Sequence, residues 1–162
     1  MGGTGEKSGG GCLCGAVRYA FSGEIMFAGV CHCAVCRKMS GGVGGAWFGV
    51  SRDSCEISGK TNVYEYAADS GNTIRRAVCA ECFAPVYNRN SMMPDMLVFA
   101  AGSLDDPALF APQMRIYTAA APSWCAPEDD LPRFAGMPVS ADEANDAEKI
   151  RAAVHKTARG EG

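Results

Sequence analysis

The chain has 162 residues, of which 48% are apolar and 20% are charged, a composition typical of a soluble globular domain with its own hydrophobic core. The formal net charge of −3 argues against a nucleic-acid partner, because non-specific nucleic-acid binders carry a surplus of basic residues. No apolar run approaches the length of a membrane span. The unusual feature of the composition is its nine cysteines.

The first ten residues are rich in glycine and are expected to form a flexible tail. They contain no apolar stretch of the kind found in a signal peptide. We therefore expect a cytoplasmic, reducing location and no membrane partner. In such a compartment, clustered cysteines are more often metal ligands than disulfides.

Between Cys12 and about Phe134, short runs that resemble strands alternate with turns that contain glycine. No helical period separates these runs, which argues against a parallel βαβ sheet and predicts a mainly β fold. Residues 105–107 are expected to form a turn, and residues 128–132 an acidic loop or a single helical turn. The predicted strands are Ala16–Phe21, Met26–Val30, Ala46–Val50, Asn62–Tyr66, Thr73–Val78, Pro85–Tyr87, Leu97–Ala101 and Arg115–Thr118.

The C-terminal stretch has the features of a helix. Ser140 and Glu143 fit a capping box, and apolar residues then recur at helical spacing, at Ala147, Ile150 and Val154. The pattern predicts a helix over about residues 142–158. We expect this helix to pack loosely or to serve in self-association, which would give a homo-oligomer.

Two cysteine pairs predict a closed metal site. Cys79-Ala-Glu-Cys82 is a C-x-x-C knuckle, and Cys12-Leu-Cys14 is a C-x-C pair at the start of a strand. Residues i and i+2 of an extended chain point to the same side, so both sulfurs of the second pair can face one ion. Zinc favours four thiolates in a tetrahedron. We therefore predict a structural zinc site at Cys12, Cys14, Cys79 and Cys82.

A third group, Cys31, Cys33 and Cys36, places three thiols within six residues. It supplies three ligands from one loop and leaves the fourth corner of a tetrahedron open, as a catalytic zinc requires in order to bind water or a substrate thiolate. His32 stands between two cysteines that face the same side, so its side chain is expected to point away from the metal. The group predicts a second zinc, at an active site.

Other interpretations of the cysteines fit part of the pattern. A C-x-x-C can be a thioredoxin-type redox pair, but neither pair has a βαβ context, and haem attachment needs histidine where Arg37 and Phe83 stand. Spacing alone does not distinguish zinc from an iron–sulfur cluster, and a fourth protein ligand would make the second site structural as well. Cys55 and Cys125 belong to neither group and are expected to be buried, small apolar residues.

An ordered set of motifs runs through the chain: Gly11–Tyr19, Cys31–Lys38 with Ser40-Gly41, Ala46–Phe48, Cys79–Cys82, Ala101–Pro107, Trp124 and Leu131-Pro132. Together they resemble the glutathione-dependent formaldehyde-activating enzyme family, which includes centromere protein V-like proteins. The resemblance spans about residues 10–135. It divides the chain into a tail over 1–10, a family-like zinc domain over 11–135 and a C-terminal helical extension over 136–162.

The resemblance implies a β-tent fold of coiled antiparallel sheets. It also implies a structural zinc on the two cysteine pairs and an active-site zinc at Cys31, Cys33 and Cys36, which are then the catalytic residues. The family's activity joins formaldehyde and glutathione into S-hydroxymethylglutathione and is classed as a carbon–sulfur lyase. A small thiol such as glutathione is the implied partner.

On this hypothesis Arg37 and Lys38 receive the carboxylates of the substrate, and Trp47 lines the pocket. The competing interpretations are a solvated basic turn for the charged pair and a core position for Trp47, which its strand setting favours. Gly102, Ser103 and Asp105 fit a turn better than chemistry.

The chain departs from the family pattern at three positions. The second knuckle of the family usually reads C-P-x-C-G, whereas Ala80 and Phe83 stand at the proline and glycine positions here. Glycine at the last position would allow a positive φ and a close approach of the backbone to the thiolates, so we expect Phe83 to alter the knuckle and leave all four ligands in place. Arg115 stands where histidine is frequent. Two alternatives to the enzyme therefore remain: a non-catalytic zinc module that binds a protein partner through its C-terminal helix, and a metal-free dithiol redox protein.

Overall fold

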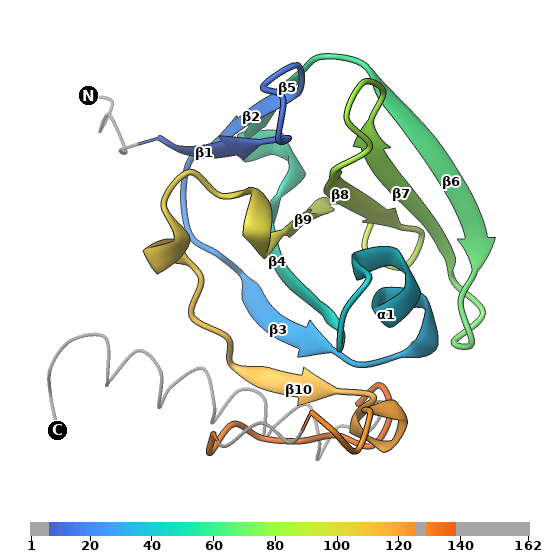
Figure 1. Ribbon diagram of the computed structural model, residues 1–162. Helices are drawn as coiled ribbons and strands as arrows, with labels where there is room; N and C mark the ends of the chain where they lie inside the picture. The colour runs from blue at the N-terminus through green and yellow to red at the C-terminus, as the bar shows by residue number, and fades with distance from the viewer. Residues whose placement is uncertain (1–6, 126–128, 139–162) are drawn as a thin grey trace, which may run out of the picture. The chain divides into compact units, whose positions relative to one another are not determined.

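The computed structural model describes residues 7–125 and 129–138 (Figure 1). Within these residues the protein is mainly β, with ten strands and one α-helix. None of its helices there has the length and hydrophobicity needed to cross a membrane. The predicted C-terminal helix over residues 142–158, and with it the expected self-association, lies outside the described residues.

The chain divides into two compact units, and each is built from two separated stretches of sequence. The first unit comprises residues 7–27 and 47–110, and the second comprises residues 28–46 and the described residues from 111 onward. Within residues 7–125 and 129–138 there are also four short 3-10 helices, at Arg52–Ser54, Ala101–Ser103, Pro107–Leu109 and Thr118–Ala120.

The first unit contains two sets of antiparallel strands. In the smaller set, β2 (Arg18–Phe21) pairs with β1 (Ser8–Gly11) on one side and β5 (Cys55–Ser58) on the other. In the larger set the strands follow one another in the order β4 (Gly45–Ser51, in this unit from Trp47), β9 (Met96–Ala100), β8 (Pro85–Asn90), β7 (Thr73–Cys79) and β6 (Thr61–Ala67).

Aromatic side chains form the core of the first unit. Tyr19 and Phe21 alternate along β2 with exposed Arg18, as the two-residue period of a strand requires, and both are 3% exposed. Phe48 and Phe99 stand opposite each other on β4 and β9 and are fully buried. The Phe99 ring lies 4.1 Å from that of Tyr19 and 5.7 Å from that of Phe48, measured between centroids. Each such burial contributes about 1.5–3 kcal/mol to folding.

The predicted flexible tail over residues 1–10 is wrong at its end, where strand β1 begins. Residues 8–10 were expected to be flexible, yet Ser8–Gly11 pairs with β2. Gly10 is buried, and a Cβ there would lie 2.2 Å from the Ser103 carbonyl oxygen and 2.4 Å from the Tyr19 hydroxyl. Glycine is needed at this position for close packing, a requirement that composition alone does not reveal.

In the second unit β3 (Phe27–Cys31, in this unit from Ala28) and β10 (Met114–Ile116) form a parallel pair, with Ile116 opposite Cys31. The all-antiparallel arrangement implied by the family resemblance is therefore wrong here. The two strands are far apart in sequence and are not joined by a hairpin, so a parallel pairing is open to them. Helix α1 (Ala34–Ser40), which was not predicted, follows β3 and ends at Gly41 with φ of 68°.

Candidate metal centres and active site

The four thiols of Cys12, Cys14, Cys79 and Cys82 come together in the first unit. Their sulfurs all lie within 4.8 Å of one another, with 3.6 Å between Cys12 and Cys14 and 3.8 Å between Cys14 and Cys79. A tetrahedral site with zinc–sulfur bonds of about 2.3 Å places its sulfurs about 3.8 Å apart. The observed separations are those of such a tetrahedron, so this cluster fits zinc. We call it the four-thiol cluster.

Backbone groups support the four-thiol cluster. The Val17 amide donates to the Cys12 sulfur over 3.2 Å, and the Glu81 amide donates to the Cys79 sulfur over 3.4 Å. Phe83 has a φ of 60°, and its amide donates to the Cys79 carbonyl over 3.1 Å. The knuckle thus keeps the left-handed turn that glycine would favour and retains all four thiols despite the phenylalanine.

The surroundings of the four-thiol cluster shift the pKa values of its thiols in both directions. Amide donors at Ala84 and Cys14, with the neighbouring thiols, lower the pKa of Cys82 to about 6. Burial raises the pKa of Cys12, but the Val17 amide and the neighbouring thiols outweigh it and leave the pKa below its ordinary value. The Ala16 amide lowers the pKa of Cys14, whereas its contacts with Cys82 and the other thiols raise it to about 12. A metal ion would release the Cys14 proton on binding.

The thiols of Cys31, Cys33 and Cys36 form a second cluster, in the second unit, again with all sulfurs within 4.8 Å of one another. Cys31 ends β3, Cys33 is the N-cap of α1, and Cys36 lies in the first turn, where its amide donates to the Cys33 sulfur over 3.3 Å. The cysteine side chain replaces the usual serine or aspartate of an N-cap. Among the described residues, no other histidine, cysteine or carboxylate joins this group. We call it the three-thiol cluster.

Charge is distributed unevenly within the three-thiol cluster. Hydrogen bonds from the thiols of Cys31 and Cys36, together with the Cys36 and Val35 amides, lower the pKa of Cys33 to about 2. The same contacts, with burial, raise the pKa of Cys31 well above its ordinary value. Three soft sulfur donors are suited to zinc. The predicted ligand set therefore fits the metal.

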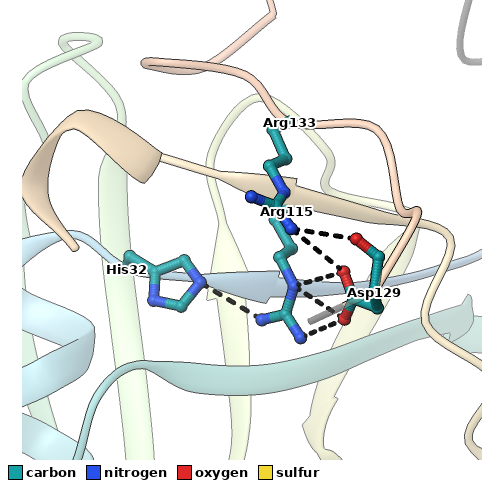
Figure 2. Close-up of polar contacts among 4 residues, drawn as sticks. All are labelled: His32, Arg115, Asp129 and Arg133. Atoms are coloured by element: carbon teal, nitrogen blue, oxygen red, sulfur yellow. Dashed lines mark hydrogen bonds and ion pairs between the residues drawn. The ribbon is translucent and has the colours of Figure 1, made fainter. Parts of the chain in front are cut away.

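His32 lies outside the three-thiol cluster, as its position between two same-side cysteines predicted. It is fully buried, with Nδ1 2.9 Å from the Val43 carbonyl oxygen and Nε2 3.3 Å from Nη1 of Arg115 (Figure 2). The Arg115 guanidinium in turn donates to the Asp129 carboxylate. Sequence reasoning noted Arg115 and the acidic loop separately but did not connect them.

These two sulfur clusters are where the comparison with known proteins becomes informative. The family model described as glutathione-dependent formaldehyde-activating enzyme matches residues 7–120. The chain belongs to this family. Both clusters lie inside the matched region, whereas Asp129 lies beyond it.

Other comparisons add little to the family assignment. No curated protein matches the chain in sequence. A crystal structure of a Rhodobacter sphaeroides protein, a structural genomics target, is similar at 18% identity and a TM-score of 0.49, over 64% of this chain and 93% of that chain.

Arg37 and Lys38, the predicted carboxylate-binding pair of this family member, lie in the last turn of α1 in the same unit as the three-thiol cluster. Lys38 is exposed, while Arg37 is half-buried and its Nε donates to the His32 carbonyl over 3.3 Å. A fixed guanidinium beside an exposed ammonium can bind a carboxylate. Their role in substrate binding stays a prediction.

Trp47 belongs to the first unit, where it is half-buried on β4. The Arg76 guanidinium carbon lies 4.9 Å from the centre of its ring and 5.6 Å from that of Tyr66. The Tyr66 hydroxyl also accepts hydrogen bonds from Arg76 over 3.1 and 2.9 Å. This buried cation between two aromatic rings was missed by sequence reasoning, because β7 offered no motif that marks Arg76. The setting favours the packed interpretation of Trp47.

Two smaller expectations have different outcomes. Cys55 and Cys125 were expected to be buried, but both are only half-buried, and the Cys55 thiol donates to the Ser51 carbonyl over 3.1 Å. Their position at partly open sites is not visible in the sequence. Gly102 and Ser103, which were expected to make a turn, lie in the 3-10 helix Ala101–Ser103. The Ser103 hydroxyl contacts the Tyr19 hydroxyl over 2.9 Å, and Asp105 pairs with Arg18.

Proposed function

We propose that this family member is a zinc-dependent carbon–sulfur lyase that interconverts a small thiol and an aldehyde with their adduct, of the S-hydroxymethylglutathione type. The observation that carries the proposal is the contrast between the two clusters. One offers four sulfurs in tetrahedral spacing, and the other offers three with no further donor among the described residues. A metal held by three protein ligands keeps a corner for a substrate.

In the direction of synthesis, the glutathione thiolate attacks the carbonyl carbon of formaldehyde. The carbon–sulfur bond forms, the π electron pair of the carbonyl moves to oxygen, and that oxygen takes up a proton. In the reverse direction the hydroxyl loses its proton, the carbonyl re-forms, and the sulfur leaves with the bonding pair. When bound, zinc supplies the positive charge that keeps a thiol deprotonated near neutral pH.

The chain's own residues have separate tasks in this proposal. Cys31, Cys33 and Cys36 hold the metal, since they are its only candidate ligands in the described part of the second unit. Arg37 and Lys38 bind the carboxylates of glutathione, because α1 displays them directly after Cys36.

The first experiment measures metal content, folding and turnover together. We expect about two zinc ions per chain, and we expect Cys33→Ser to lose one of them. Circular dichroism should stay native, while the exchange rate between glutathione and its formaldehyde adduct, followed by NMR, falls to the uncatalysed rate. Cys55→Ser, which changes a thiol outside both clusters, should keep both the metal and the rate.

Three outcomes would contradict the proposal. A wild-type protein with two zinc ions and no rate enhancement would be a non-catalytic module. Global unfolding of Cys33→Ser would give the second site a structural role. A metal-free protein with a reversible disulfide would be a redox protein.

A second experiment tests the carboxylate-binding pair. Lys38→Ala should raise the KM for glutathione about tenfold, the value of one charge-assisted hydrogen bond of about 1.5 kcal/mol. The same variant should leave the KM for cysteamine, a thiol without carboxylates, unchanged. Equal effects on both thiols would remove Lys38 from substrate recognition.

A further inference from the structure

We infer that Asp129, Arg115 and His32 form a positioning chain that holds the three-thiol cluster in its metal-binding geometry. The inference deepens the proposed function and rests on the part of it that places zinc at Cys31, Cys33 and Cys36. It also gives a role to residues 129–134, a segment that follows the region matched by the family model. All the residues involved belong to the second unit.

His32 is held at four points although it is no ligand. Its amide donates to the Ile116 carbonyl over 3.0 Å, and its own carbonyl accepts from Nε of Arg37 over 3.3 Å. Its ring nitrogens contact the Val43 carbonyl and Arg115. Since His32 is bonded covalently between Cys31 and Cys33, its position sets the positions of two of the three thiols.

The contacts of the His32 ring define its orientation. A carbonyl oxygen can only accept, so Nδ1 donates to the Val43 oxygen over 2.9 Å. A guanidinium can only donate, so Nε2 accepts from Nη1 of Arg115 over 3.3 Å. The ring is therefore fixed in one orientation, with an acceptor facing Nδ1 and a donor facing Nε2.

Arg115 can make this contact because Asp129 balances its charge. Both Asp129 oxygens accept from Nε, at 3.1 and 3.0 Å, and one also accepts from Nη2. The Arg115 side chain is only 15% exposed, and a guanidinium stays charged at every relevant pH. Without the carboxylate, a nearly buried cation would lose its counter-ion. The guanidinium would then turn toward water and release Nε2 of His32.

The backbone holds Asp129 in place. The Arg115 amide donates to the Pro132 carbonyl over 2.8 Å, and the Phe134 amide donates to the Arg115 carbonyl over 2.9 Å. A side chain of Arg133 adds a bond to the Asp129 carbonyl oxygen over 2.9 Å. Residues 129–134 thus run along β10, and Figure 2 shows Arg115 between Asp129 and His32. The Arg115 side chain thus links this segment to the His32 ring.

The test measures the rate of zinc release from each cluster, using the 162-residue chain with both metals bound. A chromogenic chelator in excess reports the release, which should have one kinetic phase for each cluster. Cys33→Ser keeps only the four-thiol metal, so the phase that remains in this variant belongs to the four-thiol cluster. Asp129→Ala should accelerate release from the three-thiol cluster about tenfold, the lower end of the effect seen when an outer-shell partner is lost. Release from the four-thiol cluster should not change, which provides an internal control.

Matched variants separate positioning from general loosening. Asp130→Ala removes the adjacent exposed carboxylate and should leave both phases unchanged. Asp129→Glu restores the charge and should recover most of the slow release. Equal acceleration of both phases, acceleration by Asp130→Ala, or no acceleration by Asp129→Ala would each overturn the inference. The readout is metal release and does not depend on catalysis. If the wild-type protein shows no lyase turnover but Asp129→Ala still releases zinc faster, the proposed function is refuted and the positioning chain stands.

Discussion

The left-handed backbone of Phe83 should lower the free energy of unfolding, because a Cβ atom is strained in this conformation. Phe83→Gly and Phe83→Ala both remove the ring, which is 67% exposed, so the two variants differ only in the Cβ atom. At a φ of 60°, a Cβ costs about 1–2 kcal/mol. Glycine loses about 0.4–1 kcal/mol to alanine through the flexibility of the unfolded chain. The glycine variant should therefore be the more stable of the two by about 1 kcal/mol.

Urea unfolding at a buffered free zinc concentration is the assay, because bound metal adds to the apparent stability. With an m-value of about 2 kcal/mol/M, the midpoint of Phe83→Gly should lie about 0.5 M above that of Phe83→Ala. Ala80→Gly is the control in the same knuckle: its backbone is not left-handed, so glycine should cost about 0.5–1 kcal/mol there. If Phe83→Ala equals or exceeds Phe83→Gly in stability, the backbone at this position is not left-handed.

Three further predictions concern the first unit. Phe99→Ala should lower the free energy of unfolding by about 3–5 kcal/mol, because it empties a fully buried aromatic site. A loss below about 1 kcal/mol, measured by urea titration, would contradict the placement of this ring in the core. Gly10→Ala should cost about 1–3 kcal/mol, since its Cβ would lie 2.2 Å from a backbone oxygen, whereas Gly102→Ala, which meets nothing within 4 Å, should stay within about 0.5 kcal/mol of wild type. The Arg18 guanidinium lowers the pKa of Asp105. This pair therefore stabilises the fold at pH values above the ordinary aspartate pKa, and the stabilisation is lost as the pH falls from that value through the lowered pKa. Arg18→Gln should flatten that acid dependence, and an unchanged slope between wild type and variant would show that the pair contributes nothing.

The strands were predictable because their side chains alternate. Each of the eight predicted strands is present with shifted ends, and β2 shows why: Tyr19 and Phe21 face the core while Arg18 faces solvent. β5 was missed because it is short and has no fully buried residue. β1 was missed because its packing depends on glycines, and a run of glycines in a sequence predicts a flexible segment.

The metal ligands were predictable from spacing, whereas their supports were not. C-x-C and C-x-x-C pairs restrict where sulfurs can meet, and the sulfurs lie together as predicted. Helix α1 was missed because its cap is a cysteine, a residue that sequence rules do not read as an N-cap. The link from His32 to Arg115 spans 83 residues, and the link from Arg115 to Asp129 spans 14. Contacts between residues so distant in sequence depend on the fold and carry no local pattern.

The two clusters differ in how much chain must be organised before they exist. Cys14 and Cys79 are 65 positions apart, and closing a loop of that length costs about 4 kcal/mol of chain entropy. The three thiols near α1 come from a strand end and one helical turn. During synthesis these three side chains have emerged with residue 36, whereas the four-thiol side chains have all emerged only with residue 82. The contacts of His32 with Arg115 and of Arg115 with Asp129 form later still, so the geometry of the shorter cluster is fixed only after most of the chain has been made.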